Sequence, residues 1–473
     1  KTPFLKKKKM KSIYLFSSFL TSITSLSEIP EWARSGKAWE NYITKSPNLL
    51  SDSQALIYNS KVDNFNINST ETFEQRYYVN SQYWNGKGPV FLSIGGEGTL
   101  NGPPGGYIAT LGQKYSALLV SLEHRFYGES IPNNSAETSN LKYLTVSQAL
   151  ADLASFTKFF QKESNTADSK WFVFGGSYPG ALASWYRHAY PDLSVGSLSS
   201  SGVVNCIVDF PQFDMQVSAA IGNKCADQIR RIEGAFERAV ATPAGWNESL
   251  DLFYCEKDMW TEDFFYMIAD SWSMADQYGA KSSLCSTILS VGEDADDATL
   301  MKTFADFSNS YWGTDFCAGG FYNTESLADP QRWDVNSRSW RWQTCYEVSY
   351  FNTAPKQGSL RSKTVNLDYH LKQCARIFGQ KMFPTSPAIN REYGGDSPLA
   401  HNVFYTDFSD DPWQRASVTY PVSSDQPYKL ATCDDCGHCL DLHTPLESDP
   451  QPIKDTRSEF ETYLEKWLQE AEN

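Results

Sequence analysis

The residues best suited to chemistry lie around Ser177, in the run Phe174-Gly-Gly-Ser177-Tyr-Pro-Gly180. The apolar stretch 171–174 before it predicts a buried strand, and a helix is expected after it. A serine on such a tight strand-to-helix turn projects its hydroxyl above the sheet edge, as a nucleophile elbow does. Small neighbours let other backbone approach closely. Glycine usually stands two positions after such a serine; here it is Pro179, which fits the first turn of a helix.

Taken alone, this run could be an ordinary turn rich in glycine and serine. A serine hydroxyl is a weak nucleophile, so it needs a base, and the base needs a carboxylate to orient it. In chains with such an elbow the order is serine, then acid, then histidine. Of the six histidines, only His438 and His443 come late enough. His438 directly follows a predicted strand and is the expected base, whereas His443 resembles a surface residue at a helix start.

The expected acid is Asp411, which follows the predicted strand 403–406. The proline after it restricts Asp411 to an extended conformation. Asp407 and Asp410 are rival candidates in the same loop. Acidic residues in loops usually serve only as caps or turn formers. The required order and the strand-to-loop positions of all three groups favour a Ser177, Asp411 and His438 triad.

Acyl transfer also needs donors for the oxyanion that develops on the substrate carbonyl. One is expected to be the backbone N–H of Tyr178, beside the nucleophile and at the positive end of a helix. The other is expected from the loop after the predicted strand 89–94, at Gly96 or Glu97.

The run Cys433-Asp-Asp-Cys436-Gly-His438-Cys439 allows a second interpretation, since four soft ligands at close spacing could bind zinc. Structural zinc sites usually draw on two separated ligand pairs, and here one short run holds every ligand. A chain that is exported also favours disulfides. We therefore expect a triad histidine flanked by disulfide cysteines, with no metal and no other cofactor.

The elements that must position these residues alternate between strand and helix up to about residue 205. Such alternation predicts a mostly parallel sheet covered on both faces, the α/β class. The region 206–350 shows several helical patterns and no clear strand, so it is expected to be a helical cap inserted into the sheet domain. The predicted strands are 89–94, 118–122, 171–174, 403–405 and 428–430, and the predicted helices are 147–160, 229–240, 263–279 and 457–471.

The beginning of the chain predicts export. After Met10 and Lys11 comes a short apolar run, followed by small polar residues up to Ser27. This pattern is typical of a secretory signal peptide, and the run is too short to span a bilayer. The expected organisation is therefore a leader and signal peptide at 1–27, a first core part at 28–205, the cap at 206–350 and a second core part at 351–473.

Composition agrees with an exported protein. Ten cysteines fit an oxidising compartment, and N-x-S/T sequons start at Asn68, Asn133 and Asn247. The net charge of 41 − 56 = −15 argues against nucleic acid as a partner. We expect a secreted protein or one in a lysosomal or vacuolar lumen, without stable membrane association.

Seven motifs together resemble the serine carboxypeptidase family of lysosomal prolylcarboxypeptidase, dipeptidyl peptidase II and thymus-specific serine protease, most of all the last. They stand in family order over most of the chain. The motifs are Gln75-Arg-Tyr-Tyr-Val-Asn80, Gly95-Gly-Glu-Gly98, Glu123-His-Arg-Phe-Tyr-Gly128, Gly175-Gly-Ser-Tyr-Pro-Gly-Ala-Leu182, Gln343-Thr-Cys-Tyr-Glu347, Asp411-Pro-Trp413 and Cys436-Gly-His-Cys-Leu-Asp-Leu442.

The resemblance implies an α/β-hydrolase domain interrupted by a helical cap, with the triad on the residues already chosen. It implies cleavage of small peptides near one terminus, often after proline and at acidic pH. It also implies two disulfides, Cys225 with Cys285 and Cys345 with Cys374; the pairing of the other cysteines stays open.

Holding a peptide terminus needs a charge of opposite sign. Glu97 and Glu347 are candidates for binding an amine, and Arg125 is a candidate for binding a carboxylate. Each has a more ordinary alternative as a member of a buried ion pair. Trp413, beside the expected acid, could form a wall of a proline-sized pocket or belong to the core.

Two other functions stay open beside a serine exopeptidase. The first is a secreted esterase or lipase on the same fold, which the elbow supports and the other motifs do not. The second is a catalytically silent binding protein, against which the complete triad counts. The expected partners are peptide substrates, and a homodimer is also open.

Overall fold

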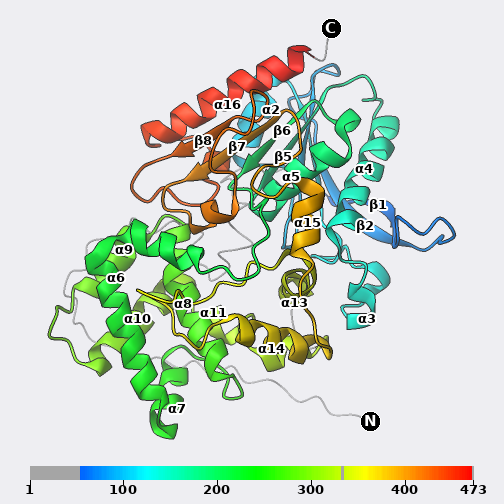
Figure 1. The fold of residues 1–473 in the computed structure, drawn as a ribbon. Coiled ribbons are helices and arrows are strands. Elements are labelled where there is room, and N and C mark those ends of the chain that lie inside the picture. The colour runs from blue at the N-terminus through cyan, green and yellow to red at the C-terminus, as the bar shows by residue number, and fades with distance from the viewer. Residues whose placement is uncertain (1–53, 332–334, 471–473) are drawn as a thin grey trace, which may run out of the picture.

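The computed structural model describes residues 54–331 and 335–470, which form an eight-stranded sheet and two layers of helices over it, with a body of further helices below (Figure 1). The strand order is β1-β2-β4-β3-β5-β6-β7-β8. The pairs β1/β2 and β2/β4 are antiparallel, and every other pair is parallel. The strands are β1 Leu56–Lys61, β2 Thr72–Asn80, β3 Val90–Ile94, β4 Leu118–Leu122, β5 Trp171–Gly176, β6 Gly196–Ser200, β7 Val403–Phe408 and β8 Tyr428–Ala431.

Helices cover both faces of this sheet. One face packs against α2 and α16 through an aromatic cluster that includes Phe172, Phe404 and Phe460. The other face packs against α4 and α5, which contribute side chains such as Phe156 and Leu182. Because water reaches neither face, the central strands β4 to β7 are buried along their whole length. The arrangement is that of an α/β-hydrolase, as predicted.

The helices around the sheet are α2 Gly106–Tyr115, α3 Thr138–Leu141, α4 Val146–Glu163, α5 Tyr178–Ala189, α15 Ser386–Tyr393 and α16 Gln451–Glu470. Short helical turns are η2 Pro132–Asn134, η3 Pro191–Leu193, η5 Pro412–Ala416 and η6 Leu440–Leu442. The predicted strands and helices of this part are all present, although α16 begins six residues earlier than expected.

Strand β6 was not predicted, because Gly-Ser-Leu-Ser-Ser lacks an apolar run. The structure shows why small residues stand there. A Cβ at Gly196 would lie 2.7 Å from the ring of Trp467 and 2.8 Å from that of Phe172. The α16 helix therefore packs so closely that the strand needs a residue without a side chain at this point.

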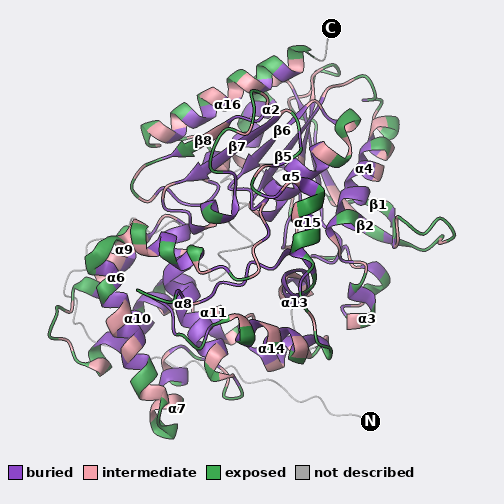
Figure 2. Cartoon of the chain, viewed as in Figure 1, coloured by how far each residue is buried: buried purple, intermediate pink, exposed green. Residues whose placement is uncertain are grey.

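We call residues 212–378, which lie below the sheet in Figure 1, the helical half. Figure 2 shows α8 buried at its centre, with the outer helices carrying exposed stripes. Its elements are α6 Gln212–Val240, α7 Pro243–Leu252, α8 Thr261–Gln277, α9 Lys281–Leu289, α10 Asp297–Trp312, α11 Asp315–Ala318, α12 Thr324–Ala328, α13 Val335–Gln343, η4 Thr344–Val348 and α14 Leu367–Phe378. The helical character predicted for the middle of the chain is confirmed, and the domain boundaries at 206 and 350 stay a prediction.

Disulfides tie the helical half together. Cys225–Cys285 joins α6 to α9, and Cys345–Cys374 joins η4 to α14, which confirms both predicted pairs. Two further bonds are Cys255–Cys317 and Cys433–Cys436.

The predicted signal peptide lies outside the described residues. Within 54–331 and 335–470, no helix is both long and apolar enough to cross a membrane. The asparagines of all three sequons, Asn68, Asn133 and Asn247, are exposed.

Candidate active site

Ser177 occupies a strained turn between β5 and α5. Its backbone adopts φ +63° and ψ −130°, a conformation that is costly for a residue with a side chain and is typical of functional sites. Its N–H donates to the carbonyl oxygen of Ser200 at 2.9 Å, which fixes the turn to the end of β6. The sequence prediction of a strand-to-helix elbow at this serine agrees with this geometry.

The glycines around Ser177 are there for close backbone contacts. A Cβ at Gly175 would lie 1.9 Å from the carbonyl oxygen of Pro179, and one at Gly180 would lie 2.9 Å from that of Ser200. Pro179 stands in the first turn of α5, where no N–H is needed. The unusual proline is therefore compatible with the elbow, and Gly180 supplies the small residue one position later.

His438 and Asp411 meet as the sequence predicted. Nδ1 of His438 donates to Oδ2 of Asp411 at 2.7 Å, and both side chains are buried. Oδ1 of Asp411 accepts the N–H of Trp413 at 2.9 Å. Burial is the largest single influence and would lower the pKa of His438, but the charges and hydrogen bonds of Asp411 and Cys439 together outweigh it, so the net pKa lies well above the usual value. The carboxylate therefore orients the imidazole and stabilises its protonated form.

The rival residues lie elsewhere. Asp410 accepts the N–H of Cys436 at 3.0 Å and forms an ion pair with Lys281 at 2.9 Å. Asp407 is buried inside β7, and desolvation raises its pKa well above the usual value. His443 ends the short helix η6 and is partly buried rather than on the surface.

The loop that carries His438 packs directly on the elbow. A Cβ at Gly176 would lie 2.9 Å from Sγ of Cys439, the residue after the histidine. The N–H of Cys439 donates to Oγ of Ser201 at 2.9 Å. Since Ser177 is itself bonded to Ser200, both residues are anchored to the same end of β6.

The loop after β3 also reaches the elbow. A Cβ at Gly96 would lie 2.8 Å from Cγ of Pro179, so this loop passes next to the first turn of α5. The position agrees with an oxyanion site made by Gly96 and Tyr178. The phenol of Tyr178 is held by Gln343, which donates to it at 2.8 Å, and it lies 3.1 Å from Nε2 of His124.

A cavity of about 450 Å³ opens over Ser177 between the sheet and the helical half. It is mostly apolar, with a few polar groups, as expected of a ligand site. The residues lining it include Glu97, Ser177, Tyr178, Val203 and Trp413 from the sheet domain, and Phe213, Tyr266, Asp270, Gln277, Arg341 and Tyr350 from the helical half.

Both expected substrate-binding residues line this cavity. Trp413 packs edge-on against Phe213, with ring centroids 4.9 Å apart, and against Tyr350 at 5.8 Å. Glu97 is buried, and Oε2 has no hydrogen-bond partner among the described residues. Desolvation raises the pKa of Glu97 to about 7.

The other two candidates for a peptide terminus do not line the cavity. Arg125 is fully buried, pairs with both carboxylate oxygens of Asp152 at 2.6 Å, and donates to backbone carbonyls. Glu347 accepts the N–H of Val146 at 2.7 Å. Arg125 is thus a member of a buried ion pair, the ordinary alternative that the sequence also allowed, and neither Arg125 nor Glu347 lines the cavity over Ser177.

The helical half holds both loops of the site, which the sequence did not indicate. The carbonyl oxygen of Gln277, at the end of α8, accepts the N–H of His438 at 2.7 Å. Its side-chain Oε1 accepts the indole N–H of Trp413 at 2.9 Å. One residue of α8 thus contacts the loop that carries the histidine and the loop that carries the acid.

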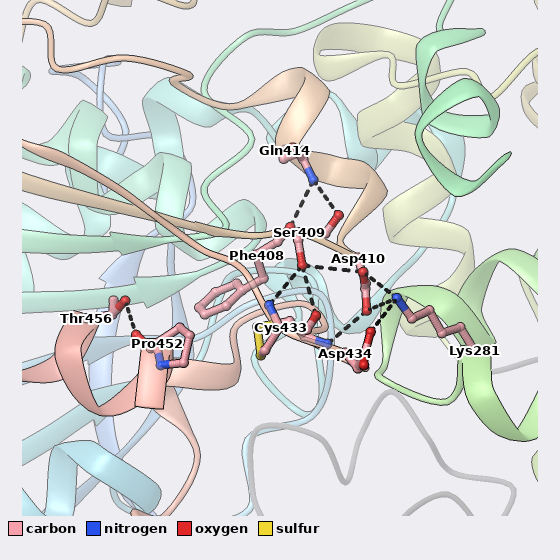
Figure 3. The surroundings of a disulfide bond; sticks show 10 residues. Lys281, Phe408, Ser409, Asp410, Gln414, Cys433, Asp434, Pro452 and Thr456 are labelled. Carbon is pink, nitrogen blue, oxygen red and sulfur yellow. Dashed lines mark hydrogen bonds and ion pairs between the residues drawn. A yellow bond between two sulfur atoms is a disulfide. The ribbon is translucent and has the colours of Figure 1, made fainter. Parts of the chain in front are cut away.

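A second support lies near the disulfide of the histidine loop. Figure 3 shows Lys281 reaching from α9 to Asp410 and Asp434, and Ser409 bonded to the backbone of Cys433. Cys433 and Cys436 form a disulfide, so their thiolates are not available for zinc. The disulfide expectation is thus confirmed for these two cysteines, whereas Cys439 is a free, buried thiol.

Comparison with known proteins adds to this geometry. The sequence matches the family described as serine carboxypeptidase S28 over residues 60–460. A probable serine protease of Arabidopsis thaliana, EDA2, is 32% identical over 97% of each chain. The human thymus-specific serine protease is 31% identical over 87% of this chain and 86% of its own, and the human lysosomal Pro-X carboxypeptidase is 26% identical over 90% of each.

Two solved structures resemble part of the chain. The acylaminoacyl peptidase of Pyrococcus horikoshii is 18% identical over 32% of this chain and 23% of its own, with a TM-score of 0.25. An arylesterase is 11% identical over 37% of this chain and 51% of its own, also with a TM-score of 0.25.

Proposed function

The chain belongs to the serine carboxypeptidase S28 family and is a serine-type exopeptidase, and we propose that Ser177, His438 and Asp411 form its catalytic triad. The observation that carries this assignment is the 2.7 Å bond between His438 and Asp411, on a loop packed against the strained turn of Ser177. Such a group of nucleophile, base and orienting acid is recognised by its geometry.

In the proposed reaction the Ser177 hydroxyl attacks the scissile carbonyl carbon while His438 takes its proton. The backbone N–H groups of Tyr178 and Gly96 stabilise the oxyanion. Collapse of the tetrahedral intermediate breaks the peptide bond, and His438 gives its proton to the leaving amine. Water, activated by the same histidine, then hydrolyses the acyl-enzyme and restores Ser177. Asp411 keeps the imidazole oriented and stabilises its cationic form throughout.

We propose that Trp413 forms a wall of the pocket for the residue before the scissile bond. Phe213 and Tyr350 complete an aromatic surface of a size that suits a flat ring such as proline. The cavity of about 450 Å³ under the helical half admits short peptides rather than folded chains. The name of the lysosomal Pro-X carboxypeptidase supports a preference for proline. Glu97 is proposed to contact the substrate from the other side of Ser177.

We further propose that the protein works in an oxidising lumen of the secretory route, either outside the cell or in a lysosome or vacuole. The four disulfides support this location, since such bonds persist in oxidising compartments. A homodimer stays a prediction.

The test is cleavage of a defined peptide mixture, followed by mass spectrometry between pH 4 and pH 8, with the Ser177→Ala protein as control. We expect loss of a terminal residue or dipeptide by the wild type only, and fluorophosphonate labelling of the wild type only. Equal cleavage or labelling of the variant would remove Ser177 from the role of nucleophile. Turnover of esters without any turnover of peptides would favour an esterase.

A further inference from the structure

Arg341, on α13, provides the one cationic side chain among the described residues that line the cavity. We propose that Arg341 binds the C-terminal carboxylate of the substrate, so that the protein removes residues from the carboxyl end of short peptides. This inference rests on the proposed function, because it concerns the same cavity and the same cleavage.

The guanidinium of Arg341 is buried, and Tyr266 is the side chain with which it shares a hydrogen bond. Arg341 is 3% exposed, and its Nε and Nη2 atoms have no hydrogen-bond partner among the described residues. Its Cζ lies 5.4 Å from the ring centre of Tyr266 and 5.7 Å from that of Phe321, which fixes the group between aromatic walls. Leaving buried charged donors unpaired is costly, so the arrangement favours an anion that arrives with the substrate.

Other buried arginines of the molecule have carboxylate or carbonyl acceptors, although Nη1 of Arg361 is also without a partner among the described residues. Arg361 pairs with both oxygens of Asp214 at 2.9 Å, and Arg125 pairs with both oxygens of Asp152. Arg338, one turn before Arg341 on the same helix, donates to backbone carbonyls that include that of Ala136 at 2.9 Å. A planar fork of N–H groups matches a carboxylate, and Arg341 is the buried fork that faces the cavity with donors to spare.

Residues next to Arg341 on α13 contact Tyr178, the residue after the nucleophile. Trp340 packs against the ring of Tyr178, with centroids 5.9 Å apart, and Gln343 of the same helix donates to the Tyr178 hydroxyl. Tyr178 supplies the proposed oxyanion N–H. A terminal carboxylate one residue beyond the scissile bond lies only about 4 Å further along the peptide, and Arg341 lines the same cavity as Ser177.

The acidic groups around the cavity favour the carboxyl end over the amino end. Desolvation raises the pKa of Glu97 to about 7 and that of Asp270 to about 6, and Asp270 already lies 3.8 Å from Arg361. Asp263, behind Arg341, is held by Thr324, Tyr369 and Gln373, and burial raises its pKa to about 6. Asp315 lies at the exposed rim. In mildly acidic solution the interior acids lose their charge, while an arginine keeps its own.

The test uses one peptide in three forms: with both ends free, with an amidated carboxyl end, and with an acetylated amino end. For the wild type we expect amidation to lower kcat/KM roughly 100-fold, mainly through KM, since charge-assisted hydrogen bonds in a buried site contribute this much. Acetylation is expected to have little effect.

Arg341→Gln is expected to lower kcat/KM for the free acid roughly 100-fold and to bring the ratio of acid to amide close to one. Arg341→Lys should restore part of that ratio, because it keeps the charge and loses the fork. Arg338→Gln is the matched control: it removes a buried guanidinium from the same helix outside the cavity and should keep the ratio of the wild type.

An unchanged ratio in Arg341→Gln would overturn the proposal. So would a wild type that tolerates amidation and loses activity on acetylation, which would point to an amine site at Glu97. If Arg341→Gln does not fold, it will lose fluorophosphonate labelling. In that case Arg341→Lys and the wild-type rates on the three peptides still decide whether Arg341 binds the terminal carboxylate. Failure of the proposed function is a separate result, since it would appear as cleavage that survives Ser177→Ala.

Discussion

The sheet domain and the helical half contribute to the same cavity in different ways. The sheet domain supplies Ser177, Asp411 and His438 from loops whose sequences are short and unusual. The helical half supplies Gln277 and Arg341 from regular helices, α8 and α13. The positions that perform chemistry need special backbone geometry, and special geometry requires particular residues such as glycine and proline. The positions that select a substrate need only a side chain on the correct face of a helix.

The largest effect is expected for Asp411→Asn, which changes a residue of the sheet domain that performs chemistry. We expect kcat to fall by about 10⁴, because an amide cannot hold the imidazole in the tautomer that accepts a proton from serine. Steady-state kinetics on a cleaved peptide measures this loss. Asp410→Asn is the control on the neighbouring residue, which pairs with Lys281 rather than with His438. If both variants lost activity equally, Asp411 would have no special role.

A smaller effect is expected at Glu97, which belongs to the sheet domain and faces the helical half. Its pKa is raised by desolvation to about 7 in the folded protein, against about 4.3 in an unfolded chain. Between these values the folded state holds the proton more tightly, so this residue makes the free energy of unfolding fall as pH rises from about 4 to 7. The full difference is about 4 kcal/mol.

Urea unfolding of the wild type and of Glu97→Gln at pH 4 and pH 7.5 measures this contribution. The variant should be more stable than the wild type at pH 7.5 by up to about 4 kcal/mol, and its advantage should be much smaller at pH 4. A constant difference between the two proteins at both pH values would show that Glu97 has an ordinary pKa.

The smallest effect is expected for Gln277→Met. This variant tests whether a residue of the helical half supports the loops that carry His438 and Asp411. Gln277→Met removes the acceptor of the Trp413 indole N–H and keeps the backbone carbonyl that holds His438. Loss of that partner costs about 1–3 kcal/mol, so we expect kcat/KM to fall roughly 10-fold or more.

Gln228→Met is the control for Gln277→Met. It removes a buried glutamine on α6 that donates to the carbonyl of Ile288, away from the cavity. It should lower stability without changing kcat/KM. Equal kinetic losses in the two glutamine variants would mean that Gln277 acts only through general stability.

The sequence predicted much of the sheet domain and little of the cavity wall. The elbow and the acid loop follow strands with clear apolar runs, and the histidine loop follows the shorter strand β8. Strand β6 was not predicted because it lacks an apolar run, and close packing requires the glycine at its first position. The sequence allowed Arg125 two roles, a carboxylate site or a buried ion pair, and the structure shows the ion pair with Asp152. A charged residue in a motif does not reveal whether its partner is the protein or the substrate.

Gln277 and Arg341 had no distinguishing signal in one sequence. Each stands in a helix where its spacing is that of any polar residue, and each reaches the cavity only because several helices pack around α8. The motif ending in Glu347 gave an indirect sign, since Gln343 within it supports Tyr178.

The contacts of Gln277 with both loops of the site bear on how such enzymes can change. A helical half that only covered the cleft could be replaced by another one, and the enzyme would gain a new selectivity without a change in its chemistry. Here the end of α8 is hydrogen-bonded to the loops that carry the base and the acid. Replacing the helical half by that of another protein would therefore lower the turnover rate as well as change the substrate preference. The exception is a replacement that keeps the end of α8 in its original position. Selectivity and rate are coupled traits in this architecture, and directed evolution of one must screen for the other.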